Sequence, residues 1–260
     1  MKQRIITGVL FGLVVLVLLF TNDWTRLILL CLIPLLSGTE YLSITKSRPV
    51  QYILFISVSI LVYYFGSQAN VDLVLITIFC LLNSVLIINL FLDNPIITHK
   101  NWSGLIGGIY IAGPFIFALS KHTYTNNKEM LISALLLIWV TDSSAYFVGS
   151  QIGKKKLFKK ISPKKTWEGF FGAGMCTLIF SYILGSIWNI YDLKFWVLFG
   201  LIVWILGALG DLVASHVKRL NNAKDSGTLL PGHGGFYDRF DALIFILPFL
   251  LLLLYFNQGL

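Results

Sequence analysis

Apolar runs as long as a lipid bilayer is thick recur from one end of this 260-residue chain to the other. A membrane-spanning helix needs about 20 apolar residues, because each residue adds about 1.5 Å along the helix axis. Nine runs meet this measure: 4–20, 24–45, 50–66, 71–92, 103–120, 129–150, 168–189, 194–213 and 240–256. Backbone groups in lipid must pair internally and no run alternates as a barrel strand does, so the runs predict helices. We therefore expect an all-α polytopic membrane protein with about nine transmembrane helices.

Composition excludes a soluble globular protein. Hydrophobic residues make up 57% of the chain and charged residues 12%, whereas soluble domains carry about 25% charged residues. Cys31, Cys80 and Cys176 lie inside apolar runs without the spacing of metal ligands, so we expect them to be small buried hydrophobic side chains. No small-residue cleavage site follows the first run, which favours a retained anchor over a signal peptide.

Lysine and arginine gather in alternate connections between the runs. Sixteen of the twenty basic residues fall on the side that holds the N-terminus and the connections after the second, fourth, sixth and eighth runs. The other side holds only Arg26, Lys121, Lys128 and Lys194. Because cytoplasmic loops are enriched in Lys and Arg, this split predicts a cytoplasmic N-terminus and an outside C-terminus. We expect a multi-pass protein of the cell (plasma) membrane.

Two connections are much longer than the rest, residues 151–167 and 214–239, and both fall on the predicted cytoplasmic side. Long connections in compact proteins usually carry function. We therefore divide the chain into an N-terminal set of about five spans, 1–130, and a C-terminal catalytic region, 131–260, which contains both long connections.

Several acidic residues lie where lipid is expected. Glu40, Asp142 and Asp211 are inside or at the ends of apolar runs, while Glu168 and Asp241 open two later runs. A charge at the bilayer centre costs about 2.5–3.5 kcal/mol on insertion scales, so such acids mark functional sites by default. The alternative is that each acid reaches the headgroup layer or pairs with a nearby lysine. For Glu40 both readings stay open, whereas Asp142 and Asp211 favour the functional one.

The first long connection reads GSQIGKKKLFKKISPKKTWEG. A lysine run beside a membrane is commonly a tether to anionic lipid or a topology signal, and KKKLFKK fits that reading. The segment SPKKTWEG is different, because Pro163 fixes a backbone angle and Trp167 can anchor at the interface. We expect Lys164 and Lys165, held between them, to bind phosphate.

The second long connection continues a helix that carries Asp211. On that helix Asp211 and Ser215 are four residues apart, and Ser215 lines up with Lys218 and Arg219. Glycines follow that permit tight turns around an anion: Gly227, Gly232, Gly234 and Gly235.

Asp238 and Asp241 are three residues apart where the last helix begins, with Arg239 beside Asp238. Carboxylates and hydroxyls suit Mg²⁺ better than zinc, and cations suit phosphates, so the stretch predicts a metal-assisted phosphate-transfer site. The acid pair has an alternative reading as helix-opening charges. His233 reads equally well as a general base or as a turn residue.

These residues form a long pattern that resembles the signature of phosphatidate cytidylyltransferases, also called CDP-diacylglycerol synthases. The residues that carry it are Ser215, Lys218, Arg219, Lys224, Asp225, Pro231, His233, Gly234, Gly235, Asp238, Arg239 and Asp241. SPKKTWEG (162–169) and DSSAYFVG (142–149) also resemble segments of that family. The resemblance covers roughly residues 139–245, and the first 130 residues carry no diagnostic motif.

The resemblance implies transfer of a cytidylyl group from CTP to phosphatidic acid, giving CDP-diacylglycerol and pyrophosphate. It implies Mg²⁺ held by Asp211 and Asp238, with Asp142 and Asp241 as further candidate ligands, and it leaves room for a monovalent cation such as K⁺. The catalytic set implied is Asp211, Lys218, Arg219, Asp238 and Arg239. The substrate-binding set implied is Lys164, Lys165, Ser215, Lys224, Asp225, His233, Gly234 and Gly235.

Two other classes of protein share some of these features. A CTP-dependent lipid kinase acting on a polyprenol-type alcohol would also use basic loops and metal carboxylates, but it would release CDP. A transporter would place acids deep in several spans, whereas these acids cluster near one side. CTP and membrane-dissolved phosphatidic acid are the expected partners, a homodimer is compatible with the sequence, and no nucleic acid is expected.

Overall fold

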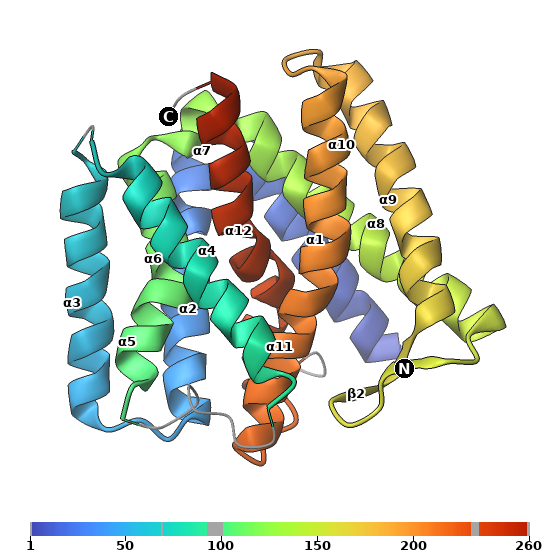
Figure 1. The fold of residues 1–260 in the computed structure, drawn as a ribbon, viewed down its shortest axis with the longest axis horizontal. Coiled ribbons are helices and arrows are strands. Elements are labelled where there is room, and N and C mark those ends of the chain that lie inside the picture. The colour runs from blue at the N-terminus through green and yellow to red at the C-terminus, as the bar shows by residue number, and fades with distance from the viewer. Residues whose placement is uncertain (1, 69, 93–100, 230–233, 259–260) are drawn as a thin grey trace.

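Helices make up most of this computed structural model, which describes residues 2–68, 70–92, 101–229 and 234–258 (Figure 1). The helices are α1 (Lys2–Phe20), α2 (Asp23–Ile44), α3 (Pro49–Gly66), α4 (Asp72–Asn89), α5 (Ser103–Gly107), η1 (Gly108–Ala112), α6 (Gly113–Ser120), α7 (Thr123–Asn126), α8 (Lys128–Ile152), α9 (Trp167–Trp188), α10 (Leu193–Leu201), η2 (Ile202–Leu206), α11 (Gly207–Leu220) and α12 (Tyr237–Gln258). Two short strands, β1 (Lys156–Phe158) and β2 (Ser162–Thr166), form an antiparallel hairpin between α8 and α9.

Within the described residues, eight helices are long and apolar enough to cross a membrane. Two of them are composite, since α5, η1 and α6 run on as Ser103–Ser120, and α10, η2 and α11 run on as Leu193–Leu220. In α1, the stretch Leu10–Phe20 is apolar. The all-α polytopic architecture is thus confirmed, while the ninth span and the orientation in the membrane stay predictions.

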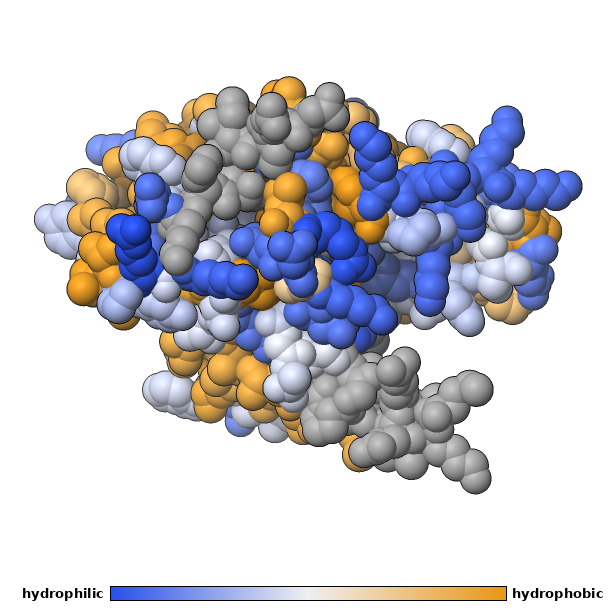
Figure 2. All heavy atoms as spheres, turned by 90° about the horizontal axis from the view of Figure 1, so that it is seen from below, coloured by the Kyte–Doolittle hydropathy of each residue, from blue (hydrophilic) through white to orange (hydrophobic). Residues whose placement is uncertain are grey.

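The start of α1, the β-hairpin and the junction between α11 and α12 lie at one end of the helix bundle, and α12 ends at the other (Figure 1). Seen from below, hydrophilic side chains gather across this end of the molecule and project from one side of it (Figure 2). The charge pattern assigned these three segments to the same side of the membrane, and in the structure they lie at the same end of the bundle.

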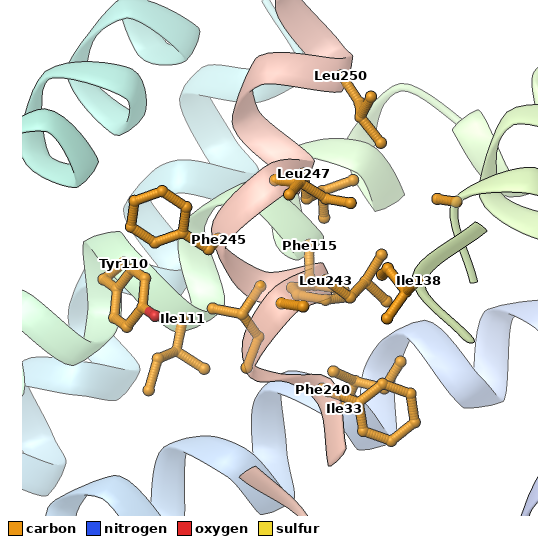
Figure 3. Packing of buried hydrophobic residues seen from close by; sticks show 14 of the residues in the cluster. Ile33, Tyr110, Ile111, Phe115, Ile138, Phe240, Leu243, Phe245, Leu247 and Leu250 are labelled. Carbon is orange, nitrogen blue, oxygen red and sulfur yellow. The ribbon is translucent and has the colours of Figure 1, made fainter. Parts of the chain in front are cut away.

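The last long helix, α12, is the centre of the bundle. It packs against α2, α4, α6, α8, α10 and α11. The apolar stretch of α12 is 67% buried, compared with 22% for α3 and for α9, which lie at the outside. Side chains such as Leu243, Leu247 and Leu250 project from α12 among residues of α2, α6 and α8, including Ile33 and Phe115 (Figure 3). This packing fixes the first turn of α12, which carries Asp238 and Asp241.

Helices α8 and α9 meet at glycines, which lets their backbones approach closely. A Cβ on Gly169 would lie 2.7 Å from the carbonyl oxygen of Ala145 and 3.1 Å from the Cα of Gly149. Close packing over small residues is a common way for helices to associate in lipid. Thr166 Oγ1 accepts a hydrogen bond from the Gly169 N–H at 3.2 Å and so caps the start of α9 at the same point. The contact brings the hairpin beside α8.

The two long connections differ from their expected bounds. The segment 151–167 is not a plain loop, because α8 continues to Ile152 and the β-hairpin fills most of the rest. The segment 214–239 is mostly helix at its ends, so that only residues 221–236 connect α11 to α12. The hydropathy of α11 falls before the helix ends, because its last two turns carry polar side chains.

The cysteines were expected to be buried. Cys31 is exposed on the surface of α2, and Cys80 and Cys176 are partly covered. An apolar side chain on a spanning helix can face lipid instead of protein, so an apolar run does not by itself predict burial in the bundle.

The Gly169→Ala substitution tests the contact between α8 and α9. The added methyl group has no room against the Ala145 carbonyl, so we expect a loss of about 1–3 kcal/mol in stability. Thermal unfolding in detergent measures it. Gly207→Ala is the matched control, because its Cβ would lie 3.9 Å from the nearest side chains and helix propensity favours Ala. Equal melting temperatures for the two variants would contradict the packing described.

Candidate active site

The polar face of α11 supplies the first residues of the site. Ser215 Oγ donates to Asp211 Oδ1 at 3.2 Å, one helical turn apart, as their spacing predicts. Lys218 is buried one turn further on, whereas Arg219 is exposed and donates to the Ala223 carbonyl at 3.0 Å. The helix therefore turns Asp211 and Lys218 toward its neighbours, whereas Arg219 binds the connection that follows the helix.

Asp238, in the first turn of α12, is surrounded by donors. Lys218 Nζ forms an ion pair with Asp238 Oδ1, and the two side chains are 9% and 10% exposed. Asp238 Oδ2 accepts the backbone N–H groups of Ser226 at 2.7 Å and Gly235 at 3.2 Å. Gly234 has φ +82°, and a Cβ there would lie 2.9 Å from Asp238 Oδ2, so glycine lets the loop approach this carboxylate.

Asp211 is held from the other side by the β-hairpin. Lys165 Nζ lies 2.6 Å from Asp211 Oδ2 and also donates to the Ala208 carbonyl at 3.2 Å. The neck of the hairpin is closed by Glu168, whose carboxylate accepts the Lys155 N–H at 3.1 and 3.2 Å. Glu168 thus has a structural contact, while Lys165 joins the hairpin to the acid on α11.

Asp142 and Asp241 complete a group of carboxylates from three helices. Asp142 on α8 and Asp241 on α12 both lie within electrostatic range of Asp211 and of each other. Asp241 is 9% exposed, and its Oδ1 accepts the Ala242 N–H at 2.7 Å. Lys218 lies between the two acids expected to act together, because it pairs with Asp238 and is also within electrostatic range of Asp211. The fold therefore brings acids far apart in the sequence into one region.

A cleft of about 430 Å³ opens between α8, the β-hairpin, α9 and α11. One part of its lining is charged and holds Asp142, Asp211, Lys164 and Lys165. Another part is apolar and holds Ala145, Phe170, Ala173 and Trp204. Because the charged part lies at the hydrophilic end of the bundle, the cleft can accept a molecule with an anionic head and an apolar body.

The donor chemistry of this region fits Mg²⁺, which prefers oxygen ligands and carboxylates above all. In the parts of the chain that the structure describes, however, no three His, Cys, Asp or Glu side chains are arranged to hold a metal ion together. Two lysine ammonium groups instead lie against the acids, Lys165 on Asp211 and Lys218 on Asp238. These ammonium groups neutralise the carboxylates that a divalent ion would neutralise.

The remaining predicted residues lie around this region. Lys224 and Asp225 are exposed on the connection between α11 and α12. Arg239 is exposed on α12 and lies within electrostatic range of Asp142. His233 falls outside the described residues, so its two readings stay open.

Glu40 is the residue whose place the sequence left undecided. It lies on α2, is 7% exposed, and accepts hydrogen bonds from the connection between α11 and α12. Its interpretation as a headgroup-facing or lysine-paired acid is therefore wrong. The sequence shows an acid within an apolar run and glycines in a distant loop, but nothing in it indicates that the two are in contact.

The fold and the site define a polytopic membrane protein with a cleft that is lined by lysines and carboxylates on one side and by apolar residues on the other. A family model described as "Cytidylyltransferase family" matches residues 2–257. A phosphatidate cytidylyltransferase of Bacillus subtilis is 34% identical, over 98% of this chain and 97% of its own length. One of Staphylococcus haemolyticus is 32% identical, over 98% of this chain and 99% of its own length. One from Staphylococcus aureus is 42% identical over 58% of this chain and 57% of its own. The chain belongs to the phosphatidate cytidylyltransferase family. The similarity thus extends through the first 130 residues, beyond the segment that carries the motifs.

The buried pair of Lys218 and Asp238 gives a prediction on stability. Lys218→Met leaves the Asp238 carboxylate buried without its cation, which we expect to cost about 3–5 kcal/mol. The double variant Lys218→Met with Asp238→Asn removes both charges and keeps an amide oxygen for the Ser226 and Gly235 N–H groups, so it should regain most of that loss. Thermal unfolding in detergent compares the two, and a double variant no more stable than the single one would contradict the pairing.

Proposed function

We propose that the protein transfers the cytidylyl group of CTP to phosphatidic acid, with Mg²⁺, to give CDP-diacylglycerol and pyrophosphate. The observation that carries the proposal is the cleft, whose lysines and carboxylates adjoin an apolar wall at the hydrophilic end of the bundle. Relatives of nearly the same length are named for this reaction. A lipid substrate and a soluble nucleotide can meet only at such a boundary.

In the proposed reaction an oxygen of the lipid phosphate attacks the α-phosphorus of CTP. A new P–O bond forms, the bond from the α-phosphorus to the bridging oxygen breaks, and pyrophosphate leaves with that electron pair. No side chain has to act as a nucleophile, because phosphatidate brings its own oxyanion. The protein has to hold two polyanions in line and neutralise their charge.

We assign Lys164 and Lys165 to a substrate phosphate, because both line the cleft and Lys165 already neutralises Asp211. Lys218, Arg219 and Lys224 are assigned to the phosphates of CTP, with Ser215, Asp225, His233, Gly234 and Gly235 alongside. Arg239 is assigned to a phosphate or to orienting the acids near it. The apolar wall formed by Phe170 and Trp204 would lie against the acyl chains.

Asp211 and Asp238 are the first candidates to hold Mg²⁺, with Asp142 and Asp241 next to them. A bound divalent ion would offset the charge that develops on the phosphate oxygens. The chain's own part is to hold Asp211 through Lys165, and Asp238 through Lys218 and the loop N–H groups. We expect the protein to lie in the plasma membrane with this site facing the cytoplasm. A homodimer and a bound monovalent cation such as K⁺ are further expectations.

Identification of the products tests the proposed reaction. Purified protein in detergent is incubated with phosphatidic acid, Mg²⁺ and CTP labelled in the α-phosphate. We expect the label to enter the lipid and pyrophosphate to be released. Release of labelled CDP would instead indicate a lipid kinase, and omission of Mg²⁺ or addition of a chelator should stop the reaction.

Substitution of the acids and the hairpin lysines separates their roles. Asp211→Asn should lower kcat by about a hundredfold or more, because it removes charge at the reaction centre. Lys164→Ala should raise a substrate KM by about tenfold, the loss of one charge-assisted hydrogen bond. Lys194→Ala, at the opposite end of the bundle, is the control and should leave both constants unchanged. Full turnover by Asp211→Asn would remove that residue from the reaction centre.

A further inference from the structure

Glu40 carries the main contact between the first half of the chain and the connection that precedes α12. Its Oε1 accepts the Phe236 N–H at 2.9 Å. Its Oε2 accepts the Tyr237 N–H at 2.9 Å and the Ser226 hydroxyl at 2.7 Å. Three donors on one buried carboxylate make a strong and directional contact, since hydrogen bonds to an ionised acceptor are about twice as strong as neutral ones.

Ser226 connects Glu40 to Asp238 through hydrogen bonds. While its hydroxyl donates to Glu40, the same Ser226 Oγ accepts the Asp238 N–H at 3.3 Å. The Ser226 N–H donates to Asp238 Oδ2 at 2.7 Å. One serine therefore holds both the backbone and the carboxylate of Asp238, and Glu40 fixes the serine.

The glycines of the connection leave room for this carboxylate. A Cβ on Gly235 would lie 2.0 Å from Ser226 Oγ and 2.2 Å from Glu40 Oε2. A Cβ on Gly227 would lie 2.6 Å from Glu40 Oε1. Any larger residue at either position would displace Glu40 from the loop. The glycines and Glu40, which lie far apart in the chain, are thus parts of one arrangement.

We propose that Glu40 is a positioning residue for cytidylyl transfer, which acts through Ser226 to hold the Asp238 carboxylate in its reactive orientation. The inference rests on the proposed function, because it takes Asp238 to serve the reaction. Glu40 itself touches no reacting atom. Small displacements of a positioned group lower rates steeply, so the loss of Glu40 appears in turnover even when the protein remains folded.

Four variants test the proposal: Glu40→Ala, Glu40→Gln, Ser226→Ala and the double variant Glu40→Ala with Ser226→Ala. We expect Glu40→Ala to lower kcat per folded molecule by about tenfold to a hundredfold. Glu40→Gln should keep more activity, because its carbonyl oxygen can still accept the Ser226 hydroxyl while its amide cannot accept a second donor. The double variant should lose no more than Glu40→Ala alone, because the two residues act in series.

A readout other than activity accompanies these rates. Amide hydrogen exchange at Phe236, Tyr237 and Asp238 should speed up in Glu40→Ala, where their acceptors are lost or released. Leu29→Ala, a buried change on the same helix far from the loop, is the control. It should lower the melting temperature but leave both kcat per folded molecule and exchange at these three amides unchanged.

The outcomes separate this inference from the function on which it rests. Wild-type protein without cytidylyl transfer overturns the proposed function, and the inference with it. Active wild-type protein with unchanged turnover in Glu40→Ala overturns the inference alone. Additive losses in the double variant would also overturn it, since Glu40 would then act by a route other than Ser226.

Discussion

An ionised carboxylate inside a helix bundle in lipid has to be met by cations or hydrogen-bond donors, because water is not there to solvate it. The arrangement of this protein follows from how each acid meets that requirement. Lys165 reaches Asp211 from the hairpin, Lys218 reaches Asp238 from the neighbouring helix, and backbone N–H groups meet Glu40. The pair of Lys218 and Asp238 joins two consecutive helices, whereas the contacts of Lys165 and Glu40 join segments that are further apart in the chain. Neutralising the acids therefore also assembles the site.

Under the proposed function, the ion pair of Lys165 with Asp211 neutralises this acid before the substrates arrive. Lysine is a flexible point charge on a long stem, so Lys165 can pair with Asp211 in the free protein and still turn to a phosphate. The charged part of the cleft lies beside an apolar wall, which suits a lipid whose phosphate and chains must be bound at once. The hairpin supplies the lysines of the cleft, while α8 and α11 supply its carboxylates.

Much of this could be predicted from the sequence. The helical content, the pairing of Asp211 with Ser215, and the position of Asp238 at the start of a helix follow from local spacing, which the structure confirms. The contact of Glu40 with Ser226 could not be predicted, because it joins residues 186 positions apart and leaves no periodic trace.

Two local features were also missed, each for a physical reason. The hairpin strands are three and five residues long, too short to show an alternating pattern. The end of α11 was placed too early, because hydropathy reports where a helix leaves apolar surroundings and not where its hydrogen bonding stops. By contrast, the exposed Arg219 matches the motif but donates to the Ala223 carbonyl, because spacing gives the face of the helix on which a residue lies and not its partner.

The central place of α12 has a consequence for how such an enzyme can change over time. One continuous helix supplies both the interior of the bundle and the acids at its end, so its register cannot shift by a residue at one end alone. A mutation that repacks the interior and rotates or slides α12 would move Asp238 and Asp241 with it. Adaptation to a thinner bilayer or a colder habitat must therefore come mainly through the outer helices, such as α3 and α9, whose lipid-facing surfaces can vary while the axis of the molecule stays fixed.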